Sequence, residues 1–481
     1  MDRASAVLIT LVAYKLVLVA IGVWASRRSR SEGDFFLGGR GLGPWVAAIS
    51  YSSSASSAWT LLGISGVAYA IGVSALWIIL GSIIGMLVAW FWMAPRLRSV
   101  SHEAGYLTLT DFLLRDTGGA TRLALGGSVT FIIVVSFTVY VAAQFQGAAT
   151  TFASTFDLSF TKSVLLGAAI ILVYTLLGGF WAVSVTDTLQ GLLMAATAVL
   201  LPLAALAAVG GIDGFLSGLR AVSTPEQLSF SAGSAGLTAL GIVVGGLAVG
   251  IGTYGQPHLL VRFMALRDDR SLRQARVITI FWYVVVFGGM CFLGLAGHIL
   301  HPTLDNPETV FFVLTESLFP TLLGAVLLAA VLSAIMSTAD SQLLVAASAV
   351  AHDLGLGRRV PGGVMLVSRL SVALIVLLAV LVALYLPERI FDRVLFAWIA
   401  LGSAFGPLIF LRLAGLTVPG RRALLSVWVG FALAVGLSLA PATPGSVAER
   451  LLPFVAALLA LLPPRRVPVS EALPEADSAR S

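Results

Sequence analysis

About thirteen apolar stretches follow one another along nearly the whole chain, separated by short polar segments. A stretch of about 20 apolar residues is long enough to cross the hydrocarbon core of a bilayer as a helix. Only 11% of the 481 residues are charged, whereas soluble domains contain about 25%. The single cysteine, Cys291, excludes a disulfide framework. We therefore expect an all-α integral membrane protein that sits in the lipid bilayer and has no sizeable soluble domain.

The predicted membrane spans have boundaries that are set only by hydropathy. They cover residues 5–25, 43–71, 73–95, 123–153, 162–180, 185–209, 236–261, 277–300, 321–352, 364–386, 391–412, 422–440 and 447–463. We expect one transmembrane transport domain over residues 1–463. The polar, proline-containing residues 464–481 are expected to form a disordered cytoplasmic tail.

Arginine residues orient the chain in the membrane, because cytoplasmic loops are enriched in basic residues. One set of alternate loops is basic and the other is relatively acidic, which predicts a cell-membrane protein with its amino terminus outside and its carboxyl terminus in the cytoplasm. This distribution favours membrane topology over nucleic-acid binding. His258 and Arg262 are expected to anchor the cytoplasmic end of the seventh span. The basic loops contain Arg27, Arg28, Arg30, Arg40, Arg96, Arg98, Arg262, Arg267, Arg270, Arg273, Arg276, Arg358, Arg359, Arg412, Arg421, Arg422, Arg465 and Arg466.

The ninth span carries a polar face that an apolar helix would not otherwise tolerate. Ser337, Asp340 and Ser341 share one face at helical spacing, with Thr338 beside them and Ala334 one turn earlier. An ionisable residue at this depth marks a functional site by default. A row of oxygen ligands without Cys or His suits a hard cation. A structural salt bridge from Asp340 to a neighbouring helix is the alternative interpretation.

Two spans contain residues that favour an interrupted helix. Residues 50–59 are rich in serine, whose hydroxyls compete for backbone hydrogen bonds. Residues 245–257 contain several glycines and end in Pro257. The two spans are five apart, as expected for inverted repeats, and matching interruptions point to a substrate and ion site. Small-residue packing between helices is the alternative.

Asp187 is a second acidic residue, at the cytoplasmic start of the sixth span. Its carboxylate either caps the helix, where negative charge is favourable, or belongs to an ion site or ion exit path.

Five ordered motifs resemble those of the sodium:solute symporter family, and most closely those of its bacterial sodium/proline permeases. They lie in residues 34–40, 178–187, 255–265, 336–344 and 396–407, and the resemblance extends from about residue 34 to about residue 429. It implies a LeuT-like core of two inverted five-helix repeats, over about 43–209 and 236–412. One additional helix precedes this core and two follow it.

The resemblance also implies a set of ion ligands. The main sodium site would use backbone carbonyls of Ser53, Ser56 and Ala334 and the hydroxyls of Ser337 and Thr338. A second cation site would use Asp187, Ser337, Asp340 and Ser341. A carboxylate at Asp340 departs from the hydroxyl residues that are usual in the family.

The substrate-binding residues match the proline permeases less well. Val249 and Thr253 replace the Trp and Tyr that would enclose the substrate ring, and Ala55 replaces an Asp near the sodium site. The remaining candidates for the pocket are Trp59, Tyr140, Gln144 and Pro257.

Together these features predict a sodium-coupled symporter, not an enzyme, that imports a small organic solute such as proline. Half-helix amide groups suit a substrate carboxylate, so an amino acid or organic acid is the natural class. Two alternatives stay open: a proton-coupled carrier that uses Asp340 and Asp187 as relay carboxylates, and a non-transporting membrane sensor. The sequence does not specify the oligomeric state.

Overall fold

The computed structural model describes residues 3–26, 32–156, 158–177, 179–358, 360, 363–386 and 388–466. The described residues are mostly helical, apart from a short antiparallel pair between β1 (Leu416–Thr417) and β2 (Arg465–Arg466). Most of the predicted tail, residues 467–481, lies outside the described residues. So do Arg27, Arg28, Arg30 and Arg359, which contributed to the predicted orientation.

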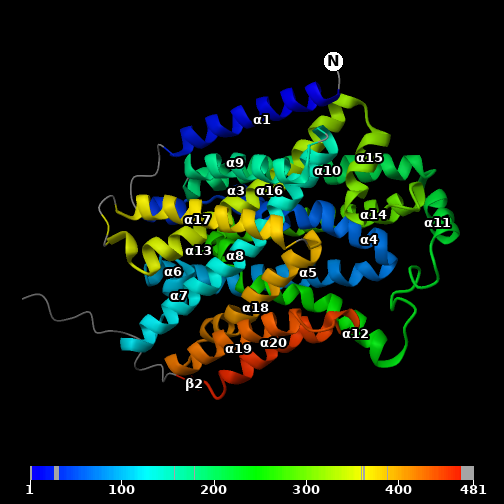
Figure 1. Cartoon of the computed structure of the whole chain (residues 1–481). Coiled ribbons are helices and arrows are strands. Elements are labelled where there is room, and N and C mark those ends of the chain that lie inside the picture. Colours follow the sequence, from blue (N-terminus) through cyan, green and yellow to red (C-terminus); the bar gives the residue numbers. More distant parts are fainter. Residues whose placement is uncertain are drawn as a thin grey trace, which may run out of the picture.

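Each predicted span has a helical counterpart in the structure (Figure 1). The first repeat comprises α3 (Pro44–Ala58) with α4 (Ser65–Ile71), α5 (Leu76–Val88) with α6 (Ala94–Glu103), α8 (Gly119–Phe156), α9 (Phe160–Leu177) and α10 (Phe180–Ala208). The second comprises α12 (Gly236–Ala248) with α13 (Pro257–Ala265), α14 (Asp269–Leu300), α16 (Thr321–Ser348), α17 (Gly363–Tyr385) and α18 (Ile390–Leu413). Outside the repeats lie α1 (Arg3–Ser26), α19 (Gly420–Ser438) and α20 (Val447–Ala460).

Short helices lie between these spans: α2 (Glu32–Leu37), α7 (Leu109–Leu113), α11 (Gly211–Val222) and α15 (Val310–Leu318). Among the described residues, nine helical stretches are long and apolar enough to cross a membrane, and α1 and α9 contribute shorter apolar helices. One of the nine, Pro44–Glu103, doubles back at Gly72, where φ is +68°. That stretch therefore contains two crossings, α3–α4 and α5–α6 (Figure 1), and both pack against α14.

Both predicted interruptions are present. In the first repeat the helix breaks at Ser57, whose φ is 47° and ψ is −172°, and a π-helical turn over Trp59–Ile64 follows. In the second, Val249–Gly255 forms a 3₁₀ segment, and Gln256 is extended with ψ 102°. Pro257 then occupies the first turn of α13, where its missing N–H leaves no bond unmade. The two breaks are therefore explained by the residues that predicted them.

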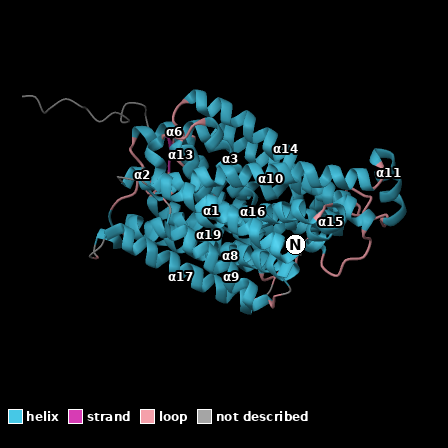
Figure 2. Cartoon of the chain, turned by 90° about the horizontal axis from the view of Figure 1, so that it is seen from above, coloured by secondary structure: helices cyan, strands magenta, loops and turns pink. Residues whose placement is uncertain are grey.

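The broken segments meet in the centre of the bundle. Helix α3 packs against α10, α14 and α16, and the 3₁₀ segment packs against α5 and α18. A Cβ on Gly85 of α5 would lie 2.4 Å from the Gly250 carbonyl oxygen, so this glycine lets the two backbones touch. Helices α19 and α20 cover α18 on one side, and α1 covers α10 and α16 on the other. Figure 2 shows α1 lying across α16 when the bundle is seen from above.

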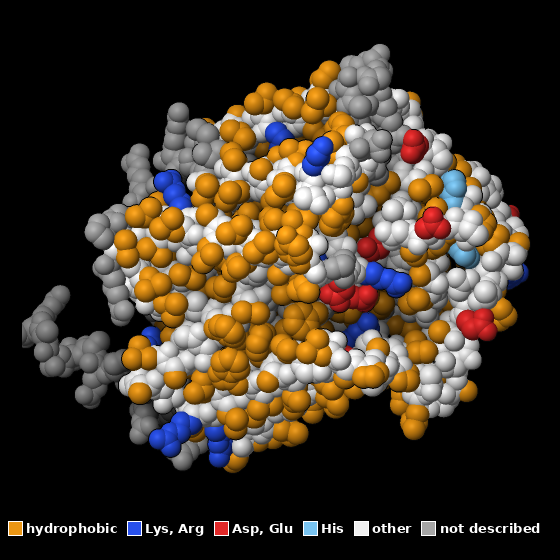
Figure 3. All heavy atoms as spheres, in the orientation of Figure 1, with side chains coloured by type: hydrophobic (Ala, Val, Ile, Leu, Met, Phe, Trp, Pro, Cys, Tyr) orange, Lys and Arg blue, Asp and Glu red, His pale blue; other side chains and the backbone are white. Residues whose placement is uncertain are grey.

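The outer surface of the bundle is apolar. Figure 3 shows hydrophobic side chains over most of one face, with few charged groups among them. Leu123, Phe281 and Leu374 are among the large apolar side chains that are more than half exposed. An exposed apolar surface of this extent fits contact with lipid.

Candidate functional site

A cluster of backbone and hydroxyl oxygens joins the break in α3 to the middle of α16. The Ser337 Oγ lies 3.3 Å from the Ser53 carbonyl oxygen and 3.2 Å from the Ala334 carbonyl oxygen. Thr338 Oγ1 donates to the Ser54 carbonyl oxygen at 3.0 Å. All of these residues are fully buried. The structure therefore brings together Ser53, Ala334 and Ser337. Thr338 contacts the next carbonyl of α3, that of Ser54.

The helix break explains why carbonyl oxygens are available here. The positive φ of Ser57 interrupts the backbone ladder, and the Ala58 N–H donates to Gln144 Oε1 at 3.1 Å. The Ser54 carbonyl, one turn earlier, is left to accept from Thr338 of α16. Freed carbonyls at an unwound helix are the groups that coordinate sodium in transporters of this architecture. Ser56, the remaining predicted sodium ligand, makes no contact with Ser337 or Thr338 among the described hydrogen bonds. Its hydroxyl donates to the Ser52 carbonyl instead.

A pocket lies beside the break. Five of its ten lining residues are aromatic and none is charged. The Trp59 ring stacks on Phe391 with the ring centroids 5.6 Å apart, and its edge meets Phe287. The lining residues are Ala55, Trp59, Ser82, Tyr140, Thr253, Tyr283, Phe287, Val394, Leu395 and Trp398.

Three of the six predicted substrate residues, Trp59, Tyr140 and Thr253, line this pocket. Gln144 is buried outside the lining, and its Oε1 accepts from the Ala58 N–H at the break. Val249 is buried outside the lining, and Pro257 lines a separate cavity toward α7 and the end of α16.

Sequence reasoning placed Ala55 only near the sodium site and missed six further lining residues. Trp398, Val394 and Leu395 lie on α18, and Trp398 belongs to a motif on which the family resemblance rests. Tyr283, Phe287 and Ser82 carry no signal that separates them from ordinary apolar or small helix positions. The sequence alone therefore does not predict which residues of α5 and α14 line the pocket.

Asp187 does not cap a helix in solvent. It is fully buried, and its Oδ2 accepts from Arg262 Nη2 at 2.8 Å. The same guanidinium contacts Ser341 Oγ at 2.6 Å and Ser54 Oγ at 2.9 Å. The prediction that His258 and Arg262 anchor the membrane interface is wrong, because His258 is fully buried and Arg262 is only 1% exposed.

Asp340 has a different set of neighbours from Asp187 and Ser341. Its Oδ1 accepts a hydrogen bond from Thr175 Oγ1 of α9 at 2.5 Å. Lys15 of α1 contributes an attractive electrostatic interaction with the same carboxylate. The structure therefore joins Asp187 and Ser341 through Arg262 and turns Asp340 toward α9 and α1.

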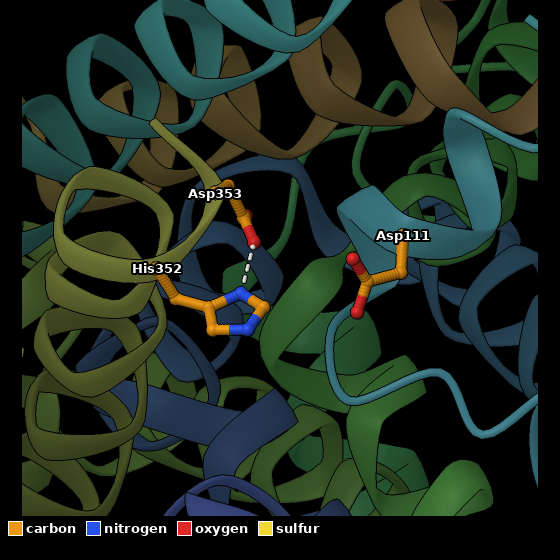
Figure 4. Close-up of side chains that lie close together, drawn as sticks. All are labelled: Asp111, His352 and Asp353. Atoms are coloured by element: carbon orange, nitrogen blue, oxygen red, sulfur yellow. Dashed lines mark hydrogen bonds and ion pairs between the residues drawn. The ribbon is translucent and has the colours of Figure 1, made fainter. Parts of the chain in front are cut away.

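A third polar cluster, Asp111, His352 and Asp353, joins α7 to the π-helical turn Ala349–Asp353 that follows α16 (Figure 4). One possible ligand atom from each residue lies within 4.8 Å of the others. Each carboxylate already accepts hydrogen bonds: Asp353 from His352 and Thr108, and Asp111 from the backbone of Leu107 and Thr108. These bonds make the cluster a polar junction between the two elements.

Two interrupted helices that meet in the core of an inverted-repeat bundle, beside an aromatic pocket, define a secondary transporter. The profile of the sodium:solute symporter family matches residues 35–430. The chain belongs to the sodium:solute symporter family, and is a multi-pass membrane transporter rather than an enzyme.

Curated relatives match most of the chain. An osmoregulated proline transporter of Bacillus subtilis (OpuE) is 37% identical over 416 residues, which cover 85% of this chain and 83% of that protein. Sodium/proline symporter 2 of Staphylococcus saprophyticus is 36% identical over 421 residues, 84% of this chain and 80% of that protein.

Solved structures show the same fold. A Na⁺-coupled sialic acid symporter in a substrate-bound outward-open state superposes with a TM-score of 0.77 at 17% identity, covering 98% of this chain and all of that one. MhsT in complex with L-phenylalanine superposes with a TM-score of 0.54 at 16% identity, covering 87% of this chain and 97% of that one. The predicted LeuT-like architecture is confirmed.

Proposed function

We propose that this protein couples the entry of sodium to the uptake of a small zwitterionic amino acid, with proline as the first candidate. Two of its curated relatives are named as a proline transporter and a sodium/proline symporter. The pocket supports this class of solute, because an aromatic lining suits an apolar side chain or ring.

The observation that carries the proposal is the shared use of α3 by both sites. Ser53 presents its carbonyl to Ser337, while Ala55 and Trp59, two and six residues further along, line the pocket. An ion that bridges Ser53 and Ser337 would hold the broken helix against α16 and so shape the pocket wall. Sodium then raises solute affinity, and by linkage the solute raises sodium affinity by the same factor.

Among the described residues that line the pocket, none has a charged side chain with which to bind the carboxylate and ammonium groups of an amino acid. Unwound helices supply backbone N–H and C=O groups for this purpose, and the nearby sodium adds positive charge on the carboxylate side. The indole Nε1 of Trp59 is buried and has no hydrogen-bond partner among the described residues, so it is available as a further donor. A solute with net charge would meet no compensating side chain.

We further propose that the amino terminus faces outside. Helices α11 and α15, which contain Asp213 and Glu316, lie at one end of the bundle, and α6, which contains Arg96 and Arg98, lies at the other (Figure 1). The arginine-containing start of α14 lies beside α6, because Arg98 forms an ion pair with Asp269. Basic residues favour the cytoplasmic side. Inward movement of one sodium ion through 100 mV would then supply about 2.3 kcal/mol to drive uptake.

The test is uptake of labelled proline by the purified protein in proteoliposomes, with sodium and pH gradients imposed separately. We expect a sodium gradient to drive uptake, and Ser337→Ala to raise the half-saturating sodium concentration at least about tenfold, equivalent to ~1.4 kcal/mol. Ser371→Ala is the matched control, because this buried serine of α17 donates only to its own helix at Val367. Uptake driven by a pH gradient alone would refute sodium coupling.

A further inference from the structure

The guanidinium of Arg262 lies where three helices direct their oxygens toward one point. Its Nη2 is 2.8 Å from Asp187 Oδ2, 2.9 Å from Ser54 Oγ and 2.6 Å from Ser341 Oγ. Its Nε donates to Ser50 Oγ at 3.0 Å. These oxygens come from α3, α10 and α16, and all four residues are at least 98% buried. One carboxylate and three hydroxyls thus surround a single positive charge.

The same ligand set would suit a hard monovalent cation. Carboxylate and hydroxyl oxygens bind hard cations, and nothing softer is present in the cluster. The arginine reaches it from α13, where Nη1 also donates to the His258 carbonyl of its own helix. Asp187 Oδ1 has no hydrogen-bond partner among the described residues, so this oxygen is available to coordinate a cation.

This cluster is adjacent to the proposed sodium site. Ser53 and Ser54 are consecutive, and the first presents its carbonyl to Ser337 while the hydroxyl of the second contacts Arg262. Ser54 Oγ also lies 3.2 Å from the Ser337 carbonyl oxygen and 3.1 Å from Ser341 Oγ. Two neighbouring cation positions therefore share α3 and α16, and one of them is filled by a side chain.

We propose that Arg262 acts as a tethered cation in the second position, so that the transporter binds one sodium ion rather than two. The proposal rests on the proposed sodium coupling. A side chain cannot dissociate with the solute, so the second position contributes positive charge to the site without contributing a transported ion. Replacing the guanidinium by a neutral side chain removes the counter-charge of Asp187, and an unpaired buried carboxylate is strongly unfavourable. Sodium would then occupy the vacated position.

The experiment counts bound ²²Na⁺ per purified full-length protein at about pH 8, where protons compete least with sodium for the carboxylate. We expect one ion for the wild type, two for Arg262→Met and one for Arg262→Lys, which keeps a positive charge. Ser337→Ala should remove one ion from both the wild type and Arg262→Met. A count of two in the wild type, or of one in folded Arg262→Met, would overturn the tethered cation.

The failure of the proposed function has a separate signature, because a wild-type protein that binds no sodium refutes sodium coupling itself. A second comparison does not depend on the folding of Arg262→Met. Ser341→Ala loosens Arg262 and should slow uptake, yet it should keep one bound sodium with Kd within about threefold of the wild type, a difference under ~1 kcal/mol. Loss of the ion in Ser341→Ala, as in Ser337→Ala, would place sodium in the arginine cluster and refute the inference.

Discussion

Gly252 offers a direct test of how the pocket is built. It lies in the 3₁₀ segment between α12 and α13, against the ring of Trp398 in the pocket wall. A Cβ at this position would lie 1.8 Å from Trp398 Cδ1 and 2.4 Å from its Nε1. The backbone cannot retreat, because a Cβ on Gly255 would already lie 2.1 Å from the Leu401 carbonyl oxygen, and Gln256 Nε2 donates to the Trp398 carbonyl. The indole must therefore move in Gly252→Ala.

The expected size of the effect follows from overpacking. Inserting a methyl group into a filled core costs about 1–3 kcal/mol. If the displaced Trp398 ring enters the space of the solute, this energy is taken from solute binding. Because 1.4 kcal/mol is a tenfold change, the KM for the solute should rise about 5- to 150-fold. Sodium binding in the absence of solute should change little, since Ser337 lies on a different helix.

The assay measures solute KM in proteoliposomes and ²²Na⁺ binding to the purified protein. Gly288→Ala is the matched control, because a Cβ there would meet nothing within 4 Å. A second change, Trp398→Phe, shortens the ring and should recover part of the affinity lost in Gly252→Ala. An unchanged KM in Gly252→Ala, or a loss of sodium binding equal to the loss of solute binding, would contradict the expectation that the displaced ring acts on the solute pocket alone.

Two further predictions concern the residues that hold the broken helix and the first turn of α18. Gln144→Leu leaves the buried Ala58 N–H unpaired, so the free energy of unfolding should fall by about 1–3 kcal/mol. Gln144→Glu keeps an acceptor for this N–H, so its free energy of unfolding, measured by thermal unfolding, should fall by less. Glu308 accepts from the N–H groups of Ile390 and Phe391, and burial raises the pKa of its carboxyl. The folded protein therefore holds this proton to higher pH than the unfolded chain, and the stability gained in acid is lost as pH rises through the raised pKa. The Tm of the wild type should fall relative to that of Glu308→Gln as the pH rises above about 4.3, the ordinary pKa of a glutamate; parallel Tm profiles would contradict this.

The spans and their two breaks were predictable because their causes are local. Serines that compete for backbone bonds and a proline without an N–H act on the helix that contains them, so Ser57 and Pro257 mark the interruptions in the sequence and in the structure. The pocket wall was predictable only where a residue lies near a break, as Trp59 and Thr253 do. Phe287 lies on an apolar helix, where lipid, core and pocket positions have the same residue types.

The position of Asp340 could not be predicted from helical spacing alone. Residues on an α-helix are about 100° apart, so Asp340 and Ser341 lie on opposite sides of the direction set by Ser337, by about 60° and 40°. Spacing alone groups all three on one face. The neighbouring helices divide them, because α9 lies on the side of Asp340 and supplies Thr175, while Ser341 faces the cluster between α3 and α13. Which of two adjacent side chains belongs to an ion site is decided by tertiary packing.

Arg262 was misplaced for a related reason, since hydropathy locates a residue along a span but not within the bundle. It follows the break in the seventh span and reads as the start of a basic loop. In the structure α13 is a separate inner half-helix, covered by α2, α3 and α6, and all nine of its residues are buried. A charged side chain on such a segment must find a buried partner, and Asp187 is that partner. Asp187, for which the sequence left a helix cap and an ion site open, and Arg262, predicted as an anchor, neutralise each other beside the proposed ion site. The break that creates α13 is what allows them to meet.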